Sequence, residues 1–307
     1  MSATSSPTEG VRRLTVTDIG RMYADGERIA MLTAYDYPTA KLLDEAGIPM
    51  LLVGDSLGRA VLGYENELSV TMDDMLHHAA AVTRGARRAL VIGDMPFLTY
   101  STPEDALRNA GKFIHDAGVQ AVKVEGGVRS ARVIESLVKA GIPVMGHIGL
   151  TPQSANAIGK FRVQGKTGEQ ARAVLHDALA VQEAGAFSIV LELVPEQLAA
   201  AITERLRIPT IGIGAGAGCS GQVQVFTDLI GLGDFVPRHA RPYAHVREMV
   251  LEAAAAYAAD VAAGTFPGEA ETVRMDDAVL DDVLGRGASD RAAGSVPVGG
   301  IPLDRDL

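Results

Sequence analysis

The sequence is poor in the residues on which several classes of protein depend. It contains one cysteine, Cys219, among 307 residues, which excludes an intramolecular disulfide framework and a zinc site built on several thiolates. No run of about 18 apolar residues occurs, so no transmembrane helix is expected. Basic residues are outnumbered, with 28 Lys and Arg against 38 Asp and Glu, which disfavours nucleic acid and anionic membranes as partners.

What remains is the composition of a globular protein. Hydrophobic residues make up 47% of the chain, which is ample material for a packed core. The first residues are polar and lack the apolar core of a signal peptide. We therefore expect a soluble, cytoplasmic protein.

Short apolar, β-branched segments alternate with helical ones along most of the chain. The eight candidate strands span residues 29–36, 50–55, 89–94, 121–125, 144–148, 187–193, 210–214 and 223–230. Continuous apolar runs of this kind are typical of parallel strands that are buried on both faces. Eight β-then-α units predict a (β/α)₈ TIM barrel, although the interval between the last two strands is too short for a full helix.

Capping residues mark the expected helices. A threonine and two aspartates open a helix over 71–88, and Thr102 followed by proline opens the next. Glycines follow helical stretches as expected C-caps at Gly47, Gly118, Gly141 and Gly185. An extra helix over 15–25 precedes the first strand, and a long alanine-rich helix over 243–263 follows the last.

The chain therefore divides into three predicted parts. These are a flexible N-terminus over 1–11, a catalytic barrel over 12–267 and an acidic tail over 268–307. Residues 265–307 carry nine acidic side chains against four arginines and are rich in Gly, Pro and Ser. We expect this tail to be mostly disordered, with one short helix over 276–284.

Ionisable side chains end six consecutive predicted strands, at the end of the barrel where TIM-barrel enzymes carry their active sites. They are Asp36, Asp55 (with Ser56), Asp94, Lys123 and Glu125, His147, and Glu192. Each has a structural alternative as a helix cap, an ion pair, a satisfied core histidine or an acceptor for loop hydrogen bonds, and Asp36 fits the structural alternative best. Together they would converge on one mouth, where buried Asp, Glu and Lys are rare unless they are paired or bind a ligand.

Oxygen ligands without a cysteine or histidine cluster favour a hard cation. Asp55, Asp94 and Glu125 would form an open Mg²⁺ site, completed by water and by substrate oxygens. A 2-keto acid could chelate this ion, which would polarise its carbonyl, while Lys123 could neutralise the remaining negative charge. Glu192, across the mouth, could remove the proton α to the ketone, so the residues predict metal-assisted enolisation.

Two glycine-rich segments resemble nucleotide-binding motifs without matching them. Residues 159–167 have five residues between the two glycines where a phosphate-binding loop has four. Residues 212–218 alternate glycine with small residues after a late strand, and no long helix clearly follows. This favours a barrel loop over a dinucleotide site.

Six motifs follow one another along the chain: GDSLG at 54–58, DMPF at 94–97, KVEGG at 123–127, GHIGLTPQ at 146–153, LE at 191–192 and GIGAG at 212–216. Their order and spacing closely resemble those of the ketopantoate hydroxymethyltransferase family, which belongs to the phosphoenolpyruvate mutase/isocitrate lyase superfamily of barrels. The resemblance covers about residues 12–267, and the tail has no counterpart in it.

The resemblance implies a one-carbon transferase. Such an enzyme moves a hydroxymethyl group from 5,10-methylenetetrahydrofolate to 3-methyl-2-oxobutanoate and forms 2-dehydropantoate, the first step of pantothenate and hence coenzyme A synthesis. The implied partners are the keto acid and the folate co-substrate, with no nucleic acid and no membrane. The implied assembly is a homodecamer.

The resemblance also implies roles for individual residues. One Mg²⁺ per subunit would be held by Asp55 and Asp94, with Glu125 reaching it directly or through water. The implied keto-acid contacts are Ser56 and Lys123 together with the two aspartates, and His147 is a further residue of the substrate pocket. Glu192 is implied as the proton acceptor.

Two other functions are alternatives to the transferase. Lyases of the same superfamily cleave C–C bonds in 2-hydroxy or 2-keto diacids and usually carry a catalytic cysteine after the fourth strand, where this chain has residues 123–127 and no cysteine. A non-catalytic barrel would be favoured by the loss of Asp55, Asp94 or Glu192, and all three are present. The sequence therefore favours the transferase.

Overall fold

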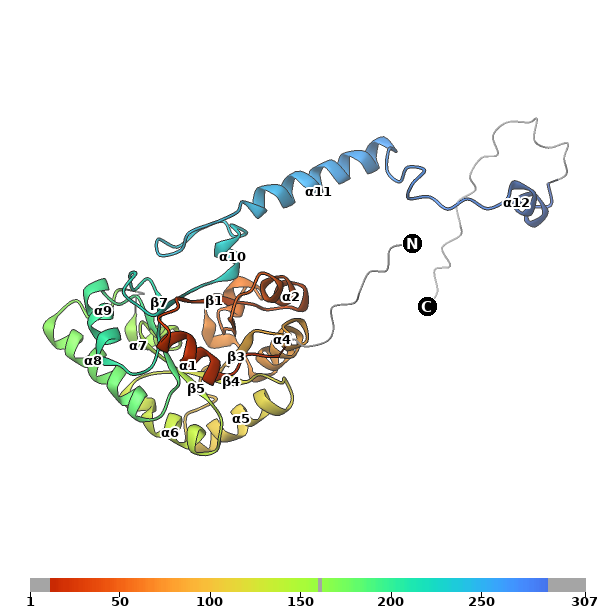
Figure 1. Cartoon of the computed structure of the whole chain (residues 1–307). Coiled ribbons are helices and arrows are strands. Elements are labelled where there is room, and N and C mark those ends of the chain that lie inside the picture. The colour runs from red at the N-terminus through yellow and green to blue at the C-terminus, as the bar shows by residue number, and fades with distance from the viewer. Residues whose placement is uncertain (1–11, 160–161, 287–307) are drawn as a thin grey trace. The chain divides into compact units, whose positions relative to one another are not determined.

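The computed structural model describes residues 12–159 and 162–286, and it shows a closed barrel of eight parallel strands. The strands follow one another around the cylinder in chain order, and helices surround them (Figure 1). This confirms the predicted TIM barrel. The predicted flexible segment 1–11 and the tail from 287 onward lie outside the described residues.

The strands are short, as parallel barrel strands usually are. They are β1 (Ile29–Thr33), β2 (Met50–Val53), β3 (Leu90–Asp94), β4 (Ala121–Glu125), β5 (Val144–Gly149), β6 (Ser188–Glu192), β7 (Thr210–Ile213) and β8 (Gly221–Gln224). Seven of them fall within or within one residue of the predicted segments. The prediction for the eighth strand begins and ends too late. β8 pairs with β1 from Gly221 onward, and residues 226–229 form a short helix instead.

The helices before, between and after the strands also agree with the capping pattern. They are α1 (Val16–Ala24), α2 (Tyr37–Glu45), α3 (Leu57–Ala60), α4 (Met72–Gly85), α5 (Pro103–His115), α6 (Ala131–Lys139), α7 (Ala155–Ile158), α8 (Gly168–Glu183), α9 (Glu196–Arg205), α10 (Phe226–Leu229), α11 (Val246–Ala263) and α12 (Asp277–Val283). Three 3₁₀ turns add η1 (Glu67–Ser69), η2 (Val128–Ser130) and η3 (Pro152–Ser154). Thr71 and Thr102 cap α4 and α5 as predicted, and the four predicted C-cap glycines all have positive φ.

Two layers of apolar side chains hold the barrel together. The larger layer lies between the strands and the surrounding helices, and it includes Phe113 of α5 and Leu137 of α6. The smaller layer fills the interior of the cylinder with residues such as Met31, Met50 and Ile92. α1 crosses one end of the cylinder (Figure 1), and its fully buried Ile19 belongs to the interior layer. The predicted extra helix therefore closes the barrel at the end opposite to the predicted mouth.

The chain forms two units, divided between Arg247 and Glu248. The first contains the barrel. The second contains most of α11 and the short α12, which the sequence predicted over 276–284; within it, the rings of Tyr257 and Phe266 meet edge to face at 5.3 Å between centroids. The predicted domain boundary at residue 267 stays a prediction.

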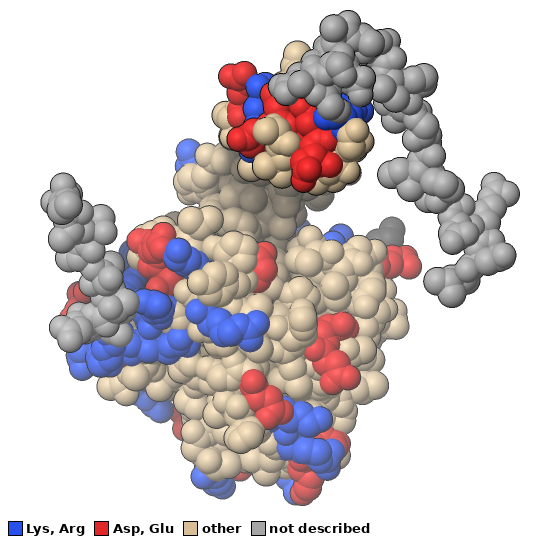
Figure 2. Space-filling model, turned by 90° about the vertical axis from the view of Figure 1, so that its right-hand side faces the viewer, with Lys and Arg blue, Asp and Glu red and all other residues tan. Residues whose placement is uncertain are grey.

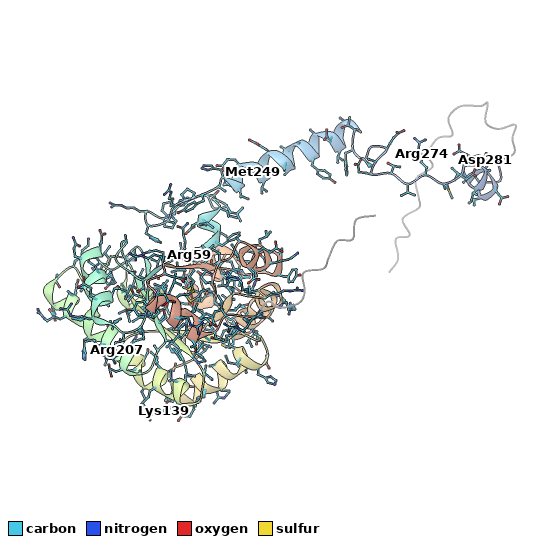
Figure 3. The ribbon with its side chains drawn as sticks, in the orientation of Figure 1. Arg59, Lys139, Arg207, Met249, Arg274 and Asp281 are labelled. Atoms are coloured by element: carbon cyan, nitrogen blue, oxygen red, sulfur yellow. The ribbon has the colours of Figure 1, made fainter. Side chains whose placement is uncertain are left out.

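On the face seen in Figure 2, several basic side chains lie next to one another on one side of the barrel unit, and acidic side chains gather on the second unit, while much of the remaining surface is uncharged. Lys139, at the end of α6, and Arg207, beyond α9, lie at the periphery of the barrel unit (Figure 3). None of the helices in the described part of the chain combines the length and the apolar character needed to span a membrane.

Candidate active site

The polar residues of the predicted mouth continue the rows of side chains that fill the barrel interior. Side chains alternate along a strand, so residues two apart face the same side. On β3 the interior row runs from Leu90 and Ile92 to Asp94, and on β4 it runs from Ala121 to Lys123 and Glu125. The interior is thus apolar towards α1 and becomes charged at the carboxyl ends of the strands, which is where TIM barrels carry their active sites.

Strand register brings these charged residues into pairs. Asp94 is the register partner of Lys123, and the lysine Nζ donates to both carboxylate oxygens of Asp94 at 2.7 Å. Both side chains are buried. Burial alone would lower the pKa of Lys123, but the carboxylates of Asp94, Asp55 and Glu125 more than offset it and raise that pKa. Lys123 is therefore a fixed positive charge within this cluster of carboxylates.

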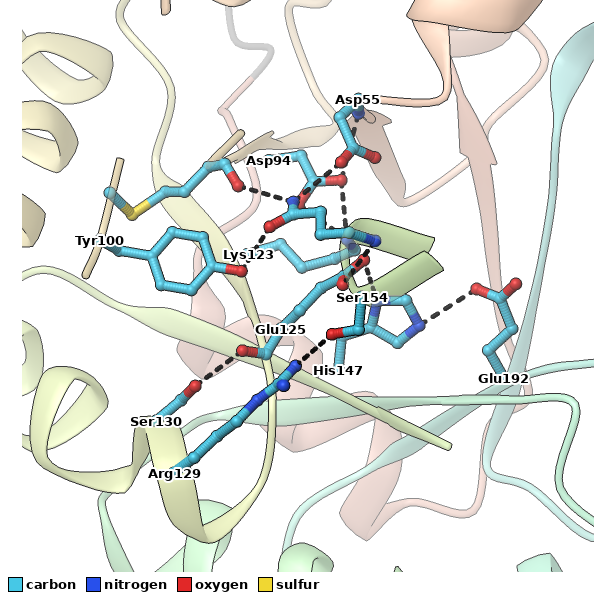
Figure 4. Close-up of polar contacts among 12 residues, drawn as sticks. Asp55, Asp94, Tyr100, Lys123, Glu125, Arg129, Ser130, His147, Ser154 and Glu192 are labelled. Carbon is cyan, nitrogen blue, oxygen red and sulfur yellow. Dashed lines mark hydrogen bonds and ion pairs between the residues drawn. The ribbon is translucent and has the colours of Figure 1, made fainter. Parts of the chain in front are cut away.

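A second chain of charges runs across the mouth through His147. Glu125 is the register partner of His147, whose Nδ1 lies 3.3 Å from Glu125 Oε1, while Nε2 lies 3.1 Å from Glu192 Oε2 (Figure 4). The two contacts are at ion-pair distance but lie off the hydrogen-bond direction, so neither ring nitrogen has a well-aligned hydrogen bond. Burial and Lys123 lower the pKa of His147, but the two glutamates outweigh them and raise it to about 8.

Asp55 and Ser56 follow β2 and complete the mouth from that side. The Asp55 backbone N–H donates to Asp94 Oδ2 at 3.2 Å, which places the two aspartates side by side. Burial and the neighbouring Asp94 raise the pKa of Asp55 well above its usual range. Ser56 Oγ lies 2.9 Å from the hydroxyl of Tyr35, so a buried tyrosine supports the serine from behind.

Two backbone features fix Glu192 at the end of β6. Gly149 on β5 has φ +90°, and a Cβ there would lie 2.3 Å from the carbonyl oxygen of Glu192, so only glycine allows this approach of the strands. Leu193, the next residue after Glu192, has φ +48°, a conformation that a branched side chain rarely adopts. Such conformations persist where the surrounding structure enforces them.

The predicted residues open into one large cavity. Its volume is about 840 Å³, and Asp55, Ser56, Asp94, Lys123, Glu125, His147 and Glu192 all line it. Apolar and aromatic side chains from the segment after β8 and from the loop after β2, such as Phe235 and Tyr64, line its outer part. The structure therefore brings every predicted site residue except Asp36 to one place.

Asp36 has the structural role that the sequence favoured. Its carboxylate accepts a hydrogen bond from the Thr39 backbone N–H at 2.7 Å and caps α2. The single cysteine also lies apart from the site, because Cys219 is fully buried and does not line the cavity. The glycine-rich segment 212–218 begins in the last two residues of β7 and continues into the loop between β7 and β8, as a barrel loop does.

Sequence reasoning missed several residues of the site. Gln153, in the predicted GHIGLTPQ motif, contacts Asp55 and Glu125 from outside the cavity, and Tyr100 donates to its side chain. Glu67, from η1, is buried at the cavity wall with Oε2 lacking a hydrogen bond, and Arg59 lies 3.9 Å from its other oxygen. Burial raises the pKa of Glu67. Only the motif could have pointed to Gln153, and nothing local distinguishes Glu67.

The donor chemistry at the mouth fits a divalent cation. Asp55, Asp94 and Glu125 bring only carboxylate oxygens, the ligands that Mg²⁺ prefers, and three negative charges when all are ionised, while Lys123 returns one positive charge. A divalent cation would balance the remaining charge. In the described ranges, no three Asp, Glu, His or Cys side chains lie close enough together to hold a metal ion in their present positions. The Asp94–Lys123 pair engages both oxygens of one of the donors.

Comparison with known proteins gives one family for this barrel. The model of the family described as ketopantoate hydroxymethyltransferase matches residues 13–269. A 3-methyl-2-oxobutanoate hydroxymethyltransferase of Chloroflexus aurantiacus is 62% identical over 274 residues, which are 89% of this chain and 97% of that protein. The protein of the same name from Dehalococcoides mccartyi is 55% identical over 273 residues, which are 88% and 97% of the two chains.

Solved structures of lower sequence identity share the fold. A phosphoenolpyruvate phosphomutase from Streptomyces platensis subsp. rosaceus superposes with a TM-score of 0.56 at 15% identity and covers 89% of this chain and 96% of its own. A phosphonopyruvate hydrolase, solved with oxalate and Mg²⁺, gives a TM-score of 0.55 at 13% identity and covers 89% and 95%. At these identities the likeness concerns the barrel alone.

Proposed function

The chain belongs to the ketopantoate hydroxymethyltransferase family, and from this premise we propose that it transfers a hydroxymethyl group from 5,10-methylenetetrahydrofolate to 3-methyl-2-oxobutanoate, forming 2-dehydropantoate. One observation carries the proposal. Glu192 faces a single cavity opposite the Asp94–Lys123 pair, so a base and a charged anchor lie on two sides of the space for a keto acid.

The chain's own residues account for keto-acid binding. The Lys123 ammonium is a permanent donor at the floor of the cavity, where it can meet the developing negative charge on the keto oxygen. Ser56 offers a hydroxyl whose position is fixed by Tyr35. Preorganised donors of this kind, in a site shielded from water, are the usual means of stabilising an enolate.

Glu192 acts as the base in this proposal. Its carboxylate removes the proton from C3 of the keto acid, and the electrons of that C–H bond form the C2–C3 double bond of the enolate. The enolate C3 then forms a bond to the methylene carbon as one of the two bonds between that carbon and the folate nitrogens breaks. A water oxygen replaces the second nitrogen as the hydroxyl oxygen, and the two released nitrogens take up the proton held by Glu192 and one proton of the water. His147 holds one oxygen of Glu192, which leaves the other for the proton.

We propose that one Mg²⁺ per subunit is held by Asp55 and Asp94, with Glu125 reaching it directly or through water. When bound, the ion polarises the keto carbonyl as a Lewis acid. The proposal is supported by the charge excess at the mouth and by the carboxylate donor set. The Lys123 ammonium neutralises part of the negative charge of these carboxylates throughout.

The size of the cavity supports a second, larger substrate. A volume of about 840 Å³ far exceeds what a five-carbon acid fills, and pockets of roughly 300–1,000 Å³ are typical of drug-sized ligands. The outer part carries Tyr64 and Phe235, and the latter is 76% exposed. Aromatic faces suit the flat rings of a folate.

On the basis of the family resemblance, we further propose that the protein is a cytoplasmic homodecamer and that it catalyses the first step of pantothenate synthesis.

Glu192→Gln tests the proposed function. We expect this variant to bind the keto acid but to form 2-dehydropantoate about 10²–10⁴-fold more slowly, the usual contribution of a positioned base. Glu183→Gln is the matched control, because Glu183 is exposed, does not line the cavity and contacts only the side chains of Arg207 and Gln182 among the described residues. Full turnover by Glu192→Gln would remove this residue from the mechanism.

A further inference from the structure

Gln153 connects two of the carboxylates at the mouth from outside the cavity. It lies in η3, just beyond β5, and is 4% exposed. Its side-chain Nε2 donates to Asp55 Oδ2 at 2.8 Å, and its backbone N–H donates to Glu125 Oε2 at 3.2 Å. One residue therefore engages one oxygen of each carboxylate, although Asp55 lies just after β2 and Glu125 at the end of β4.

The side-chain amide of Gln153 has one permitted orientation. Nε2 also donates to the carbonyl oxygen of Met95 at 2.9 Å, and Oε1 accepts from the hydroxyl of Tyr100. A flipped amide would turn its oxygen towards the Asp55 carboxylate and the Met95 carbonyl, where three acceptors would face one another. Tyr100 and Met95 thus fix the donor towards Asp55 (Figure 4 shows Tyr100 on the side of the network away from Glu192).

The Gln153 side chain is buried outside the substrate space. Neither Gln153 nor Tyr100 is among the residues that line the cavity, whereas Asp55 and Glu125 both are. The buried side-chain amide donates to the Asp55 carboxylate and the backbone N–H of the same residue donates to the Glu125 carboxylate, so both donors end on groups that face the mouth. Residues that hydrogen-bond to metal-binding side chains set their orientation and affect metal affinity as well.

We propose that Gln153 is a positioning residue that holds Asp55 and Glu125 in the orientation required to bind a divalent cation, with Tyr100 fixing its amide. The inference rests on the proposed function, because it assumes that these carboxylates bind a metal. It adds a residue to which neither the sequence motifs nor the cavity lining assigns a role. Gln153 acts through the carboxylates and does not touch the substrate.

Gln153→Met tests the inference, because methionine has a similar volume and shape but cannot make the side-chain hydrogen bonds to Asp55, Met95 and Tyr100, while the backbone N–H that donates to Glu125 is kept. We expect Mn²⁺, used as a probe ion and titrated into the full-length protein without keto acid, to bind about 10–100-fold more weakly by calorimetry. Gln182→Met is the matched control. Gln182 is also buried, but it accepts from the Arg207 backbone and is not part of the cavity wall, so this variant should bind Mn²⁺ like the wild type.

Tyr100→Phe keeps the test decisive if Gln153→Met fails to fold. This variant retains the ring and loses only the donor to Gln153, and we expect about 2–10-fold weaker Mn²⁺ binding. Unchanged affinity in either variant, once folded, or an equal loss in Gln182→Met, would overturn the inference. Wild-type protein and Asp94→Ala belong in the same titration. A wild type that binds no Mn²⁺ refutes the proposed metal site itself, and the positioning role falls with it.

Discussion

The buried pair of Lys123 and Asp94 predicts a large change in the free energy of unfolding when one partner is removed. The two side chains are 4% and 1% exposed, and Nζ lies 2.7 Å from both carboxylate oxygens. Lys123→Met removes the positive charge and keeps the length of the side chain. Asp94 is then left as a buried carboxylate beside Asp55, with no positive partner at hydrogen-bond distance.

The expected cost follows from the geometry. At an effective dielectric constant of about 20, two unit charges at this separation attract by about 6 kcal/mol. Relaxation and water entry reduce this, and removing one partner of a buried pair typically costs about 3–5 kcal/mol of unfolding free energy. For a domain of this size that corresponds to a fall in Tm of about 6–20 °C.

Urea denaturation of the full chain at constant pH measures this change. Lys139→Met is the matched control, because Lys139 pairs with Glu135 at 2.6 Å on the exposed face of α6, and such surface pairs contribute about 0–1 kcal/mol. The double variant Lys123→Met/Asp94→Asn should regain much of the loss, since no uncompensated charge remains. A Lys123→Met protein as stable as Lys139→Met would refute the reasoning.

Three further predictions concern other parts of the barrel. Ile19→Ala should lower the free energy of unfolding by about 2–5 kcal/mol in urea, because Ile19 is fully buried at the closed end of the cylinder, and a loss under about 1 kcal/mol would contradict that packing. Gly149→Ala should displace the Glu192 carbonyl and lower kcat on the order of 100-fold, whereas Gly141→Ala, also at positive φ but with open space around it, should leave kcat unchanged. Asp18→Asn should destabilise the protein at neutral pH. Hydrogen bonds from Arg12 and Thr15 hold the pKa of Asp18 in the folded protein below its ordinary value of 3.8. The stability that the Asp18 carboxylate contributes is therefore present above that value and is lost as the pH falls through the folded pKa. The difference from wild type in chemical denaturation should therefore shrink in acid, and a constant difference would contradict this assignment.

The fold was largely predictable because apolar runs and caps are local signals. Thr71 and Thr102 mark the starts of their helices, because each side chain accepts a hydrogen bond from the backbone N–H of the third following residue. This pattern is visible in the sequence. The start of β8 was not predictable in this way. Its extent depends on pairing with β1, which begins at Gly221, so residues 226–229, which the prediction included in the strand, form α10.

The candidate site was predictable where it follows from strand ends and not where it depends on long-range contacts. Lys123 and Glu125 were found because two charges on one face of a buried strand are unusual. The contact between Gln153 and Asp55 joins residues 98 apart in the chain, and the buried position of Glu67 depends on how the loop after β2 folds over the mouth. No local sequence pattern predicts the contact of Gln153 or the burial of Glu67.

Proton exchange at C3 of 3-methyl-2-oxobutanoate tests the central claim most directly. The proton NMR signal of this position is followed in D₂O with Mg²⁺, using the wild type, Glu192→Gln and Glu183→Gln, with and without 5,10-methylenetetrahydrofolate. The account predicts Mg²⁺-dependent loss of the signal with the wild type and Glu183→Gln, strongly slowed exchange with Glu192→Gln, and a new hydroxymethyl signal when the folate is added. Exchange by Glu192→Gln at the wild-type rate, or no exchange and no product with the wild type, would contradict it.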